Sequence, residues 1–290
     1  MTRALVLGGG GVTGVAWELG VLRGLEAAGV AVADADLVVG TSAGAVVGAQ
    51  LTSGIGLDRL LQAQYKPPEA TKERPAELDL EALGALWLEL AQTATSPEDL
   101  RAKLGARALA AGTVPEAERI EIIVSRLPVT EWPERPLLVT AVDVATGEFK
   151  VFDRHAGVPL TLAVAASCAV PMVWPPVRID GRRYMDGGTR SLTNADLAAG
   201  HDTVLVVAPV AELGLGPLMP GLGSELATLG PGRRVEVITP DDAALAAIGP
   251  NVLDPSRSAG AARAGLAQGE REAARVMALW TAPEAPPAAG

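Results

Sequence analysis

The sequence predicts an α/β fold, a three-layer arrangement in which a mostly parallel central sheet is flanked by helices. Short apolar runs alternate with segments whose apolar residues recur at helical spacing, a pattern typical of strands buried on both faces. Glycines stand where these runs end and the chain must turn. With 290 residues, 49% of them hydrophobic, the chain can bury a sizeable core, and we expect a single domain over residues 1–282.

The first third of the chain predicts two strand-and-helix units. Apolar residues 4–7 stop at four consecutive glycines and are followed by a helical pattern. A second apolar run, 37–39, breaks at Gly40, and a helix over 43–51 follows at once. Because neighbouring parallel strands deliver the loops at their carboxyl ends to the same crevice, we expect the two strand-to-helix loops to lie side by side.

The middle third, about 66–130, lacks a strand pattern and predicts a helical cap over the sheet. A loop rich in Pro and charge precedes three helical segments, and the second segment has Ser96 as N-cap and Pro97 at its first position. The three segments cover 78–91, the residues after Ser96, and 115–127. An apolar stripe on the first segment is compatible with core packing and with a lid that faces lipid; its residues are Leu80, Leu83, Trp87 and Leu90.

The last part returns to a strand-rich pattern. A hairpin is predicted at Asp180-Gly181, a two-residue turn between short alternating runs. A Gly- and Pro-rich stretch over 212–232 is expected to be a long mobile loop, and the tail 283–290 is expected to be disordered. Strands are expected at 137–142, 148–152, 203–207 and 234–238, and helices at 159–168 and 256–280.

The composition excludes several classes of function. The chain has 34 acidic residues against 24 Lys and Arg, and the resulting net charge of −10 disfavours a nucleic-acid partner. Its one Cys and two His form no metal-binding pattern, and we expect no cofactor. Since no apolar run is long enough to span a membrane and the start lacks signal-peptide features, we expect a cytoplasmic protein. Peripheral, transient contact with a membrane and the oligomeric state stay open.

A G-x-S-x-G pattern joins the second predicted strand to its helix and indicates a nucleophile elbow, the turn that exposes a serine at the sheet edge. Its residues are Gly40, Thr41, Ser42, Ala43 and Gly44. Ser42 is the predicted nucleophile. The loop after the first strand would supply N–H donors for the developing oxyanion. These donors are Gly9, Gly10 and Gly11. The alternative is that these small residues only permit tight packing of strand against helix.

The predicted general base is Asp186, which follows the hairpin and precedes Gly187 and Gly188. Two glycines let the chain turn sharply and bring the carboxylate toward another loop. Ser42, Asp186 and His201 could formally make a hydrolase triad. However, His201 and His155 both lie in turn-like segments and are interpreted as exposed loop residues, so we favour a Ser-Asp dyad.

The same glycine loop admits a second interpretation. Gly9, Gly11 and Gly14 satisfy the G-x-G-x-x-G fingerprint of an NAD(P)-binding Rossmann-type oxidoreductase. That fingerprint also requires an acidic residue at the end of the second strand, whereas Asp34 and Asp36 precede it. A third interpretation is an idle scaffold that keeps the fold without catalysis.

Taken together, these motifs resemble those of the patatin-like phospholipases. The resemblance covers about residues 4–210 in four ordered blocks: the glycine loop and its helix, the serine elbow, the segment from Ala166 to Val177, and a D-G-[GA] motif at Asp186-Gly187-Gly188 with Asn194 beyond it. It implies a Ser42–Asp186 dyad that cleaves fatty-acyl esters through an acyl-enzyme, as a phospholipase A, lysophospholipase or carboxylesterase does.

One position departs from the family pattern. Thr13 stands where patatin-like proteins often carry a basic residue, which puts a preference for phospholipid headgroups in doubt but leaves ester hydrolysis intact. Cys168 is interpreted as a small packing residue, and Met172, Val173 and Trp174 as candidate walls of an acyl pocket. Acyl length, headgroup, and ester or thioester chemistry stay open.

Overall fold

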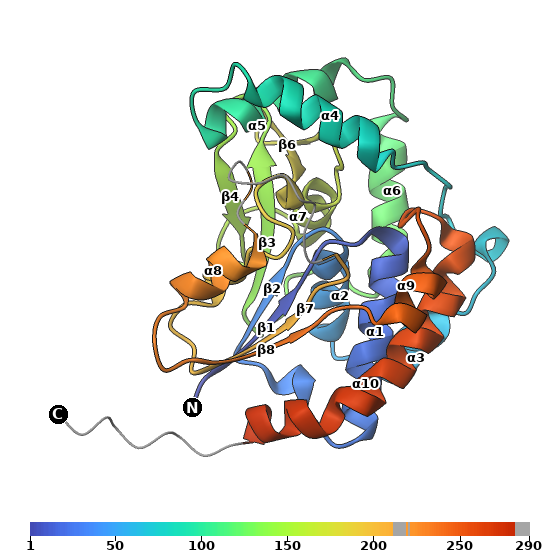
Figure 1. Ribbon diagram of the computed structural model, residues 1–290. Coiled ribbons are helices and arrows are strands. Elements are labelled where there is room, and N and C mark those ends of the chain that lie inside the picture. The colour runs from blue at the N-terminus through green and yellow to red at the C-terminus, as the bar shows by residue number, and fades with distance from the viewer. Residues whose placement is uncertain (211–218, 220, 282–290) are drawn as a thin grey trace.

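The computed structural model describes residues 1–210, 219 and 221–281 (Figure 1). Its strands are β1 (Arg3–Leu7), β2 (Leu37–Gly40), β3 (Leu137–Asp143), β4 (Phe149–Phe152), β5 (Val177–Ile179), β6 (Arg182–Asp186), β7 (Thr203–Val207) and β8 (Arg234–Ile238). Its helices are α1 (Gly11–Ala27), α2 (Ala43–Leu51), α3 (Leu57–Ala63), α4 (Leu80–Ala91), α5 (Pro97–Ala110), α6 (Glu116–Arg126), α7 (Leu160–Ser167), α8 (Leu222–Thr228), α9 (Asp242–Ile248) and α10 (Ser258–Thr281). Short 3₁₀ turns include η4 (Ala195–Ala198).

The described strands form one sheet in the order β5-β6-β3-β2-β1-β7-β8, with β4 beside β3. Parallel pairing joins β3, β2, β1, β7 and β8, whereas β4 and β6 pair with β3 in the antiparallel direction. The prediction of an α/β fold with a mostly parallel central sheet is therefore confirmed. The loops that follow β1 and β2 leave the sheet at the same edge, as expected for parallel neighbours.

The edge of β3 brings two distant parts of the chain together. Val139 pairs with Gly40 of β2 on one side and with Phe152 of β4 on the other. Two residues further on, Ala141 pairs with β4 and with Asp186 of β6. Since β4 occupies one side throughout, β2 and β6 must share the other side, and they meet there with their carboxyl ends facing each other. Any residue that directly follows β2 therefore lies close to Asp186.

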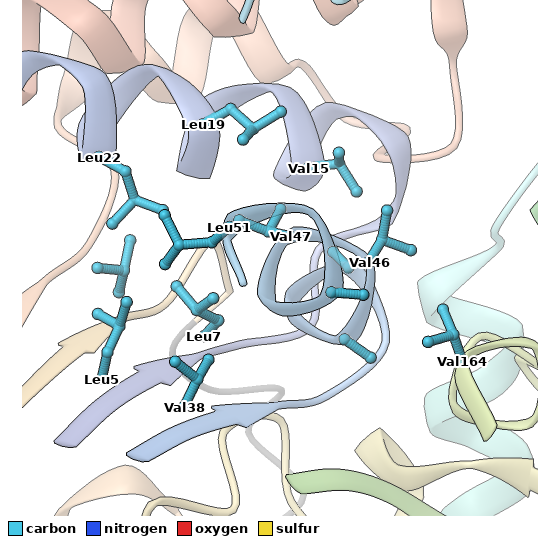
Figure 2. Close-up of a cluster of buried hydrophobic side chains, with 14 of the residues drawn as sticks. Leu5, Leu7, Val15, Leu19, Leu22, Val38, Val46, Val47, Leu51 and Val164 are labelled. Atoms are coloured by element: carbon cyan, nitrogen blue, oxygen red, sulfur yellow. The ribbon is translucent and has the colours of Figure 1, made fainter. Parts of the chain in front are cut away.

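Helices cover both faces of the sheet. On one face, leucines of β1 pack against apolar residues of α1 and α2, as Figure 2 shows for Leu5, Leu7, Leu19, Leu22 and Val47. The alternate residues of the same strands, such as Val6 and Val206, point to the other face and pack against η4 and α8. The alternation explains why these strands read as continuous apolar runs, because both faces are buried.

The central helix α1 is buried between α2 and the long carboxyl-terminal helix α10 (Figure 1). The α1–α10 crossing depends on glycines from both helices, since an added Cβ would meet the backbone of the other helix at 2.3 to 2.4 Å; they are Gly20, Gly24, Gly265 and Gly269. This close approach fixes the position of α1, which begins at Gly11, the last glycine of the loop after β1.

The cap predicted over about 66–130 is divided in the structure. Helices α4 and α5 pack on each other through Trp87, Leu90, Leu100 and Leu104 and lie beyond the end of β3 (Figure 1). Helix α6 instead packs against α7, in the helical layer that covers the sheet. The predicted N-cap is present, since Ser96 Oγ accepts a hydrogen bond from Asp99 N–H at 3.1 Å.

The sequence patterns missed three short helices, α3, α8 and α9. The prediction of a loop over 212–232 is wrong for 222–228, where Leu222 and Leu226 of α8 pack on the sheet. Residues 211–218 and 220 of that predicted loop, and the predicted tail 283–290, lie outside the described residues. Among the residues that are described, no helix combines the length and apolar character needed to cross a membrane.

Candidate functional site

Ser42 occupies a strained turn between β2 and α2. Its φ of 54° and ψ of −112° lie outside the regions that non-glycine residues ordinarily adopt. The turn also presses against the loop after β1, since Gly44 N–H donates to Gly8 O at 2.9 Å. A Cβ on Gly44 would stand 2.0 Å from the carbonyl oxygen of Leu7. A side chain at this position would therefore force the two loops apart.

Residues at the end of α7 hold the backbone of Ser42, and the Ser42 hydroxyl takes no part in these hydrogen bonds. Ser42 N–H donates to Ser167 Oγ at 2.9 Å, and Cys168 Sγ donates to Ser42 O at 3.3 Å. The hydroxyl makes no capping hydrogen bond to α2. Cys168 is buried in the core, and burial raises the pKa of its thiol to about 12. Its interpretation as a packing residue is confirmed.

Asp186 ends β6 and faces Ser42. Its Oδ1 accepts a hydrogen bond from Gly188 N–H at 2.7 Å, while Oδ2 has no hydrogen bond of ordinary geometry among the described residues. Burial raises the pKa of Asp186 to about 7, although the Ser42 hydroxyl, the Gly188 N–H and the charge of Arg119 each lower it. A carboxylate with a pKa near neutrality that lies beside a serine hydroxyl in the same cavity can accept the serine proton.

A buried polar network lies beneath the two catalytic candidates. Thr41 Oγ1 and Thr140 Oγ1 are 2.9 Å apart, and Asn194 Nδ2 donates to Thr41 Oγ1 at 3.0 Å. Asn194 Nδ2 also approaches Gly187 O at 3.4 Å. These side chains are fully buried and connect the loop of Ser42 with the loop of Asp186. Satisfied polar groups in a core fix one geometry, which suits a site whose two reacting groups come from separate strands.

The glycine loop supplies two free donors. Gly9 N–H already donates to Leu192 O at 2.8 Å, so it is engaged within the protein. Among the described residues, the N–H groups of Gly10 and Gly11 have no acceptor, as expected at the start of α1. Gly11 has a φ of 62°, and a Cβ there would stand 2.4 Å from Val252 O. Of the three predicted oxyanion donors, Gly10 and Gly11 are free to bind a ligand.

An apolar cavity of about 110 Å³ opens onto Ser42 and Asp186. Its walls come from the cap and from the loops around the sheet edge; they include Leu83, Trp87, Leu104, Val170, Leu192 and Met219. Two residues of the predicted stripe, Leu83 and Trp87, therefore line a cavity beside the candidate site, and Trp87 is buried. Met172, by contrast, is 42% exposed, whereas its neighbour Pro171 lines the cavity.

Both histidines lie at the amino ends of the parallel strands, whereas Ser42 lies at their carboxyl ends. His201 precedes β7 and so stands at its amino end, whereas Ser42 follows the carboxyl end of a strand parallel to β7. His155 follows β4, which runs antiparallel to β3, and it is exposed. Neither histidine lines the cavities at Ser42. The formal triad with His201 is not assembled in this structure.

Sequence patterns predict no role for two residues at the site. Ser167 holds the backbone of Ser42; it lies within the segment from Ala166 to Val177 that carries the resemblance, but that pattern does not reveal this contact. Arg119 looked like a solvated charge on α6, yet it is 3% exposed and close enough to Asp186 to affect its pKa. Thr13 is fully buried, and its hydroxyl donates to Val252 O at 3.2 Å. Its side chain is thus tied to the loop before α10.

The chain is similar to known proteins over most of its length. A family model described as patatin-like phospholipase matches residues 5–199. Uncharacterized NTE family proteins of Mycobacterium bovis and Mycobacterium tuberculosis are 29% identical over 185 residues, 64% of this chain. The match covers 42% of their length, so the chain spans less than half of these curated relatives. The crystal structure of VipD from Legionella pneumophila aligns with a TM-score of 0.48 and 13% identity, covering 94% of this chain and 67% of that chain.

Proposed function

We propose that this chain, which belongs to the patatin-like phospholipase family, is a serine hydrolase of fatty-acyl esters with Ser42 as nucleophile and Asp186 as general base. The observation that carries the proposal is the meeting of β2 and β6 on one edge of β3, which brings a serine in a strained turn against a buried carboxylate. Family membership at this level supports a lipid hydrolase. The NAD(P)-binding alternative has no acidic residue at the end of β2 to support it.

In the first half of the proposed reaction, Ser42 Oγ attacks the ester carbonyl carbon and its proton passes to Asp186. The carbonyl oxygen becomes an oxyanion, which the N–H groups of Gly10 and Gly11 stabilise in this proposal; among the described residues neither N–H has an acceptor. When the bond to the alcohol oxygen breaks, that oxygen takes the proton from Asp186. The alcohol leaves, and the acyl group remains bound to Ser42.

In the second half, water attacks the acyl-enzyme carbonyl and gives its proton to Asp186. The bond between the carbonyl carbon and Ser42 Oγ then breaks, Ser42 regains a proton from Asp186, and the fatty acid leaves. The apolar cavity suits the acyl chain in both halves, since its walls bury hydrocarbon and exclude bulk water. The proposal needs no histidine, because burial raises the pKa of Asp186 to about 7, near neutrality, where a carboxylate is a more effective base than at its ordinary value.

The proposal is tested by hydrolysis of p-nitrophenyl butyrate. We expect Ser42→Ala to lose activity to the background rate, because no other serine of the described residues lines the two cavities at this site. Ser53→Ala, just beyond the end of α2, is the matched control and should retain wild-type activity. Circular dichroism and thermal unfolding would establish that both variants are folded. Full activity in a folded Ser42→Ala variant would contradict the proposal.

A further inference from the structure

A second cavity meets the apolar cavity at Ser42. It measures about 20 Å³. The two cavities share Gly11, Ser42, Val170 and Leu253. In contrast to the apolar cavity, this one is cationic, because three arginines line it; they are Arg74, Arg119 and Arg126. An ester held at Ser42 would therefore lie beside both the apolar walls of one cavity and the positive charge of the other.

Arg119 differs from the other two arginines in having no carboxylate partner of its own. Arg126 makes a bidentate pair with Glu73, with both N–O distances at 2.7 Å. Arg74 forms an ion pair with Glu118 at 2.7 Å. Arg119 is 3% exposed, and its Nε and Nη1 lack a hydrogen-bond partner within the described part of the chain. Buried charged donors ordinarily have hydrogen-bond acceptors. The two unsatisfied nitrogens of Arg119 therefore indicate that a bound ligand supplies the acceptor.

Trp174 adds a third unsatisfied donor to the same cavity. The Arg119 Cζ lies 3.9 Å from the centroid of the Trp174 ring, which holds the guanidinium in place. Trp174 Nε1 is also buried and without a partner among the described residues. Burial lowers the pKa of Arg119 to about 10, so the guanidinium still carries its charge at neutral pH. These unsatisfied N–H groups belong to two residues that line one cavity, and together with the positive charge they are complementary to an oxyanion.

The space beyond the arginines can hold the remainder of an anionic group. A cavity of 20 Å³ admits roughly one oxygen atom, by comparison with the space that a buried water requires. It adjoins a larger polar cavity of about 430 Å³, and Val12 and Arg126 line both. Lysines of the loop after α3 also line the larger cavity; they are Lys66 and Lys72. An anion can thus place one oxygen on Arg119 while its other atoms lie among polar groups.

We propose that Arg119 is a specificity-determining residue that binds a phosphate-class anion on the alcohol side of the ester, while the acyl chain occupies the apolar cavity. This inference rests on the proposed ester hydrolysis at Ser42. It adds the orientation in which the ester binds, with its alcohol part toward Arg119. The substrate class is then a fatty-acyl ester whose leaving alcohol carries a phosphate. Arg119 lies on α6, outside the motifs that carry the resemblance, so sequence patterns alone do not reveal this subsite.

The test compares two esters that differ only in the phosphate, 1-dodecanoylglycerol 3-phosphate and 1-dodecanoylglycerol. We expect wild type to have a higher kcat/KM for the phosphate-bearing ester. Arg119→Gln should lower the ratio of the two kcat/KM values roughly 10- to 100-fold, the typical effect of losing a hydrogen bond to a charged group, and most of the change should appear in KM. Arg119→Lys keeps the positive charge and should restore most of the ratio.

The matched control is Arg107→Gln on α5, which removes one positive charge from an ion pair with Glu89 away from the site. It should leave the ratio unchanged, which separates local binding from long-range attraction. A wild-type ratio near one, or an unchanged ratio in folded Arg119→Gln, would overturn the inference while leaving the proposed function intact. If wild type cleaves neither ester nor p-nitrophenyl butyrate, the proposed function itself fails.

A measurement on wild type alone covers the case in which Arg119→Gln does not fold. Glycerol 3-phosphate should inhibit hydrolysis of p-nitrophenyl butyrate competitively, whereas glycerol at the same concentration should not. Inorganic phosphate should inhibit more weakly, because it lacks the glycerol that joins the phosphate to the ester. Absence of inhibition by glycerol 3-phosphate, or equal inhibition by inorganic phosphate, would contradict binding of a leaving-group phosphate.

Discussion

The floor and the roof of the site are built in different ways. The floor consists of the loops after β1, β2 and β6, which are joined by backbone pairing and by the buried network of Thr41, Thr140 and Asn194. The roof consists of α4, α5 and Met219, which contact each other through apolar side chains and carry only a small cluster of their own. The proposed reacting groups, Ser42 and Asp186, are therefore fixed by directional bonds, whereas the walls of the apolar cavity depend on non-directional packing.

This difference predicts where substitutions act on chemistry and where they act on substrate fit. Changes in the floor should affect the rate of the chemical step with every ester. Changes in the roof should affect the binding of long acyl chains and leave the chemistry in place.

The largest effect is expected from Asp186→Asn in the floor. The amide cannot accept the serine proton, so kcat for p-nitrophenyl butyrate should fall roughly 10²- to 10⁴-fold. The substitution should also stabilise the fold at pH 8. The folded chain holds the Asp186 proton up to a pKa of about 7 against an ordinary value of 3.8, so stability is lost as pH rises between these values. Removing that titration should add roughly 1 to 4 kcal/mol to the free energy of unfolding.

Thermal and urea unfolding of both proteins at pH 8 and pH 4 would check the stability part. The gap between variant and wild type should shrink toward pH 4, because that pH lies close to the ordinary pKa of 3.8 and Asp186 is then protonated in the folded state and roughly 40% protonated in the unfolded chain. An Asp186→Asn variant that is folded and fully active would remove Asp186 from the mechanism.

The next effect concerns the pH dependence of the wild type. Only ionised Asp186 can accept a proton, so kcat/KM should fall about tenfold for each pH unit below a pKa of about 7. From pH 8 to pH 5 the loss should approach about 100-fold, and it should reverse on return to pH 8. A profile that is flat between pH 5 and 8 would contradict an ionisable base in this range.

The smallest effect is expected in the roof. Trp87→Ala removes part of the cavity wall and should raise KM for a dodecanoyl ester roughly fivefold, which corresponds to about 1 kcal/mol of lost apolar contact. The rise for a butyryl ester should be smaller, since a short chain reaches less of the wall. Leu88→Ala is the control on the same helix, because Leu88 is 60% exposed, and it should leave both KM values unchanged. Equal effects on long and short esters would indicate that Trp87 does not contact the acyl chain.

The floor could be predicted from the sequence because backbone requirements restrict it to particular residues. Gly44 and Gly11 stand where a Cβ would collide with Leu7 O or Val252 O, and such constraints leave a readable glycine pattern. The convergence of Ser42 and Asp186, by contrast, depends on the pairing of β6 with the carboxyl-terminal residues of β3, Ala141–Asp143. That pairing is long-range and leaves no local pattern. The dyad was therefore predicted from residue types, from the turn-like contexts of both histidines and from the resemblance to a family, and not from the pairing itself.

The roof and the cationic cavity could not be predicted in the same way. The stripe on α4 indicated an apolar face, compatible with core packing or with a lid that faces lipid, but not what that face covers. Its residue Trp87 is buried and lines the apolar cavity. The helix α8 was missed because its stretch is rich in Gly and Pro, and packing of Leu222 on the sheet outweighs that local tendency. Arg119 has the sequence context of a surface charge, and only tertiary packing reveals its burial.

The central claim is that Ser42 and Asp186 work as a pair without a histidine. Labelling with a fluorophosphonate, followed by mass spectrometry of the peptides, tests it most directly because only an activated serine reacts. We predict a single adduct on Ser42, labelling slowed at least about 100-fold in Asp186→Asn, and wild-type labelling in a variant with both His155→Ala and His201→Ala. An adduct on another residue, or labelling that depends on either histidine and not on Asp186, would contradict the account.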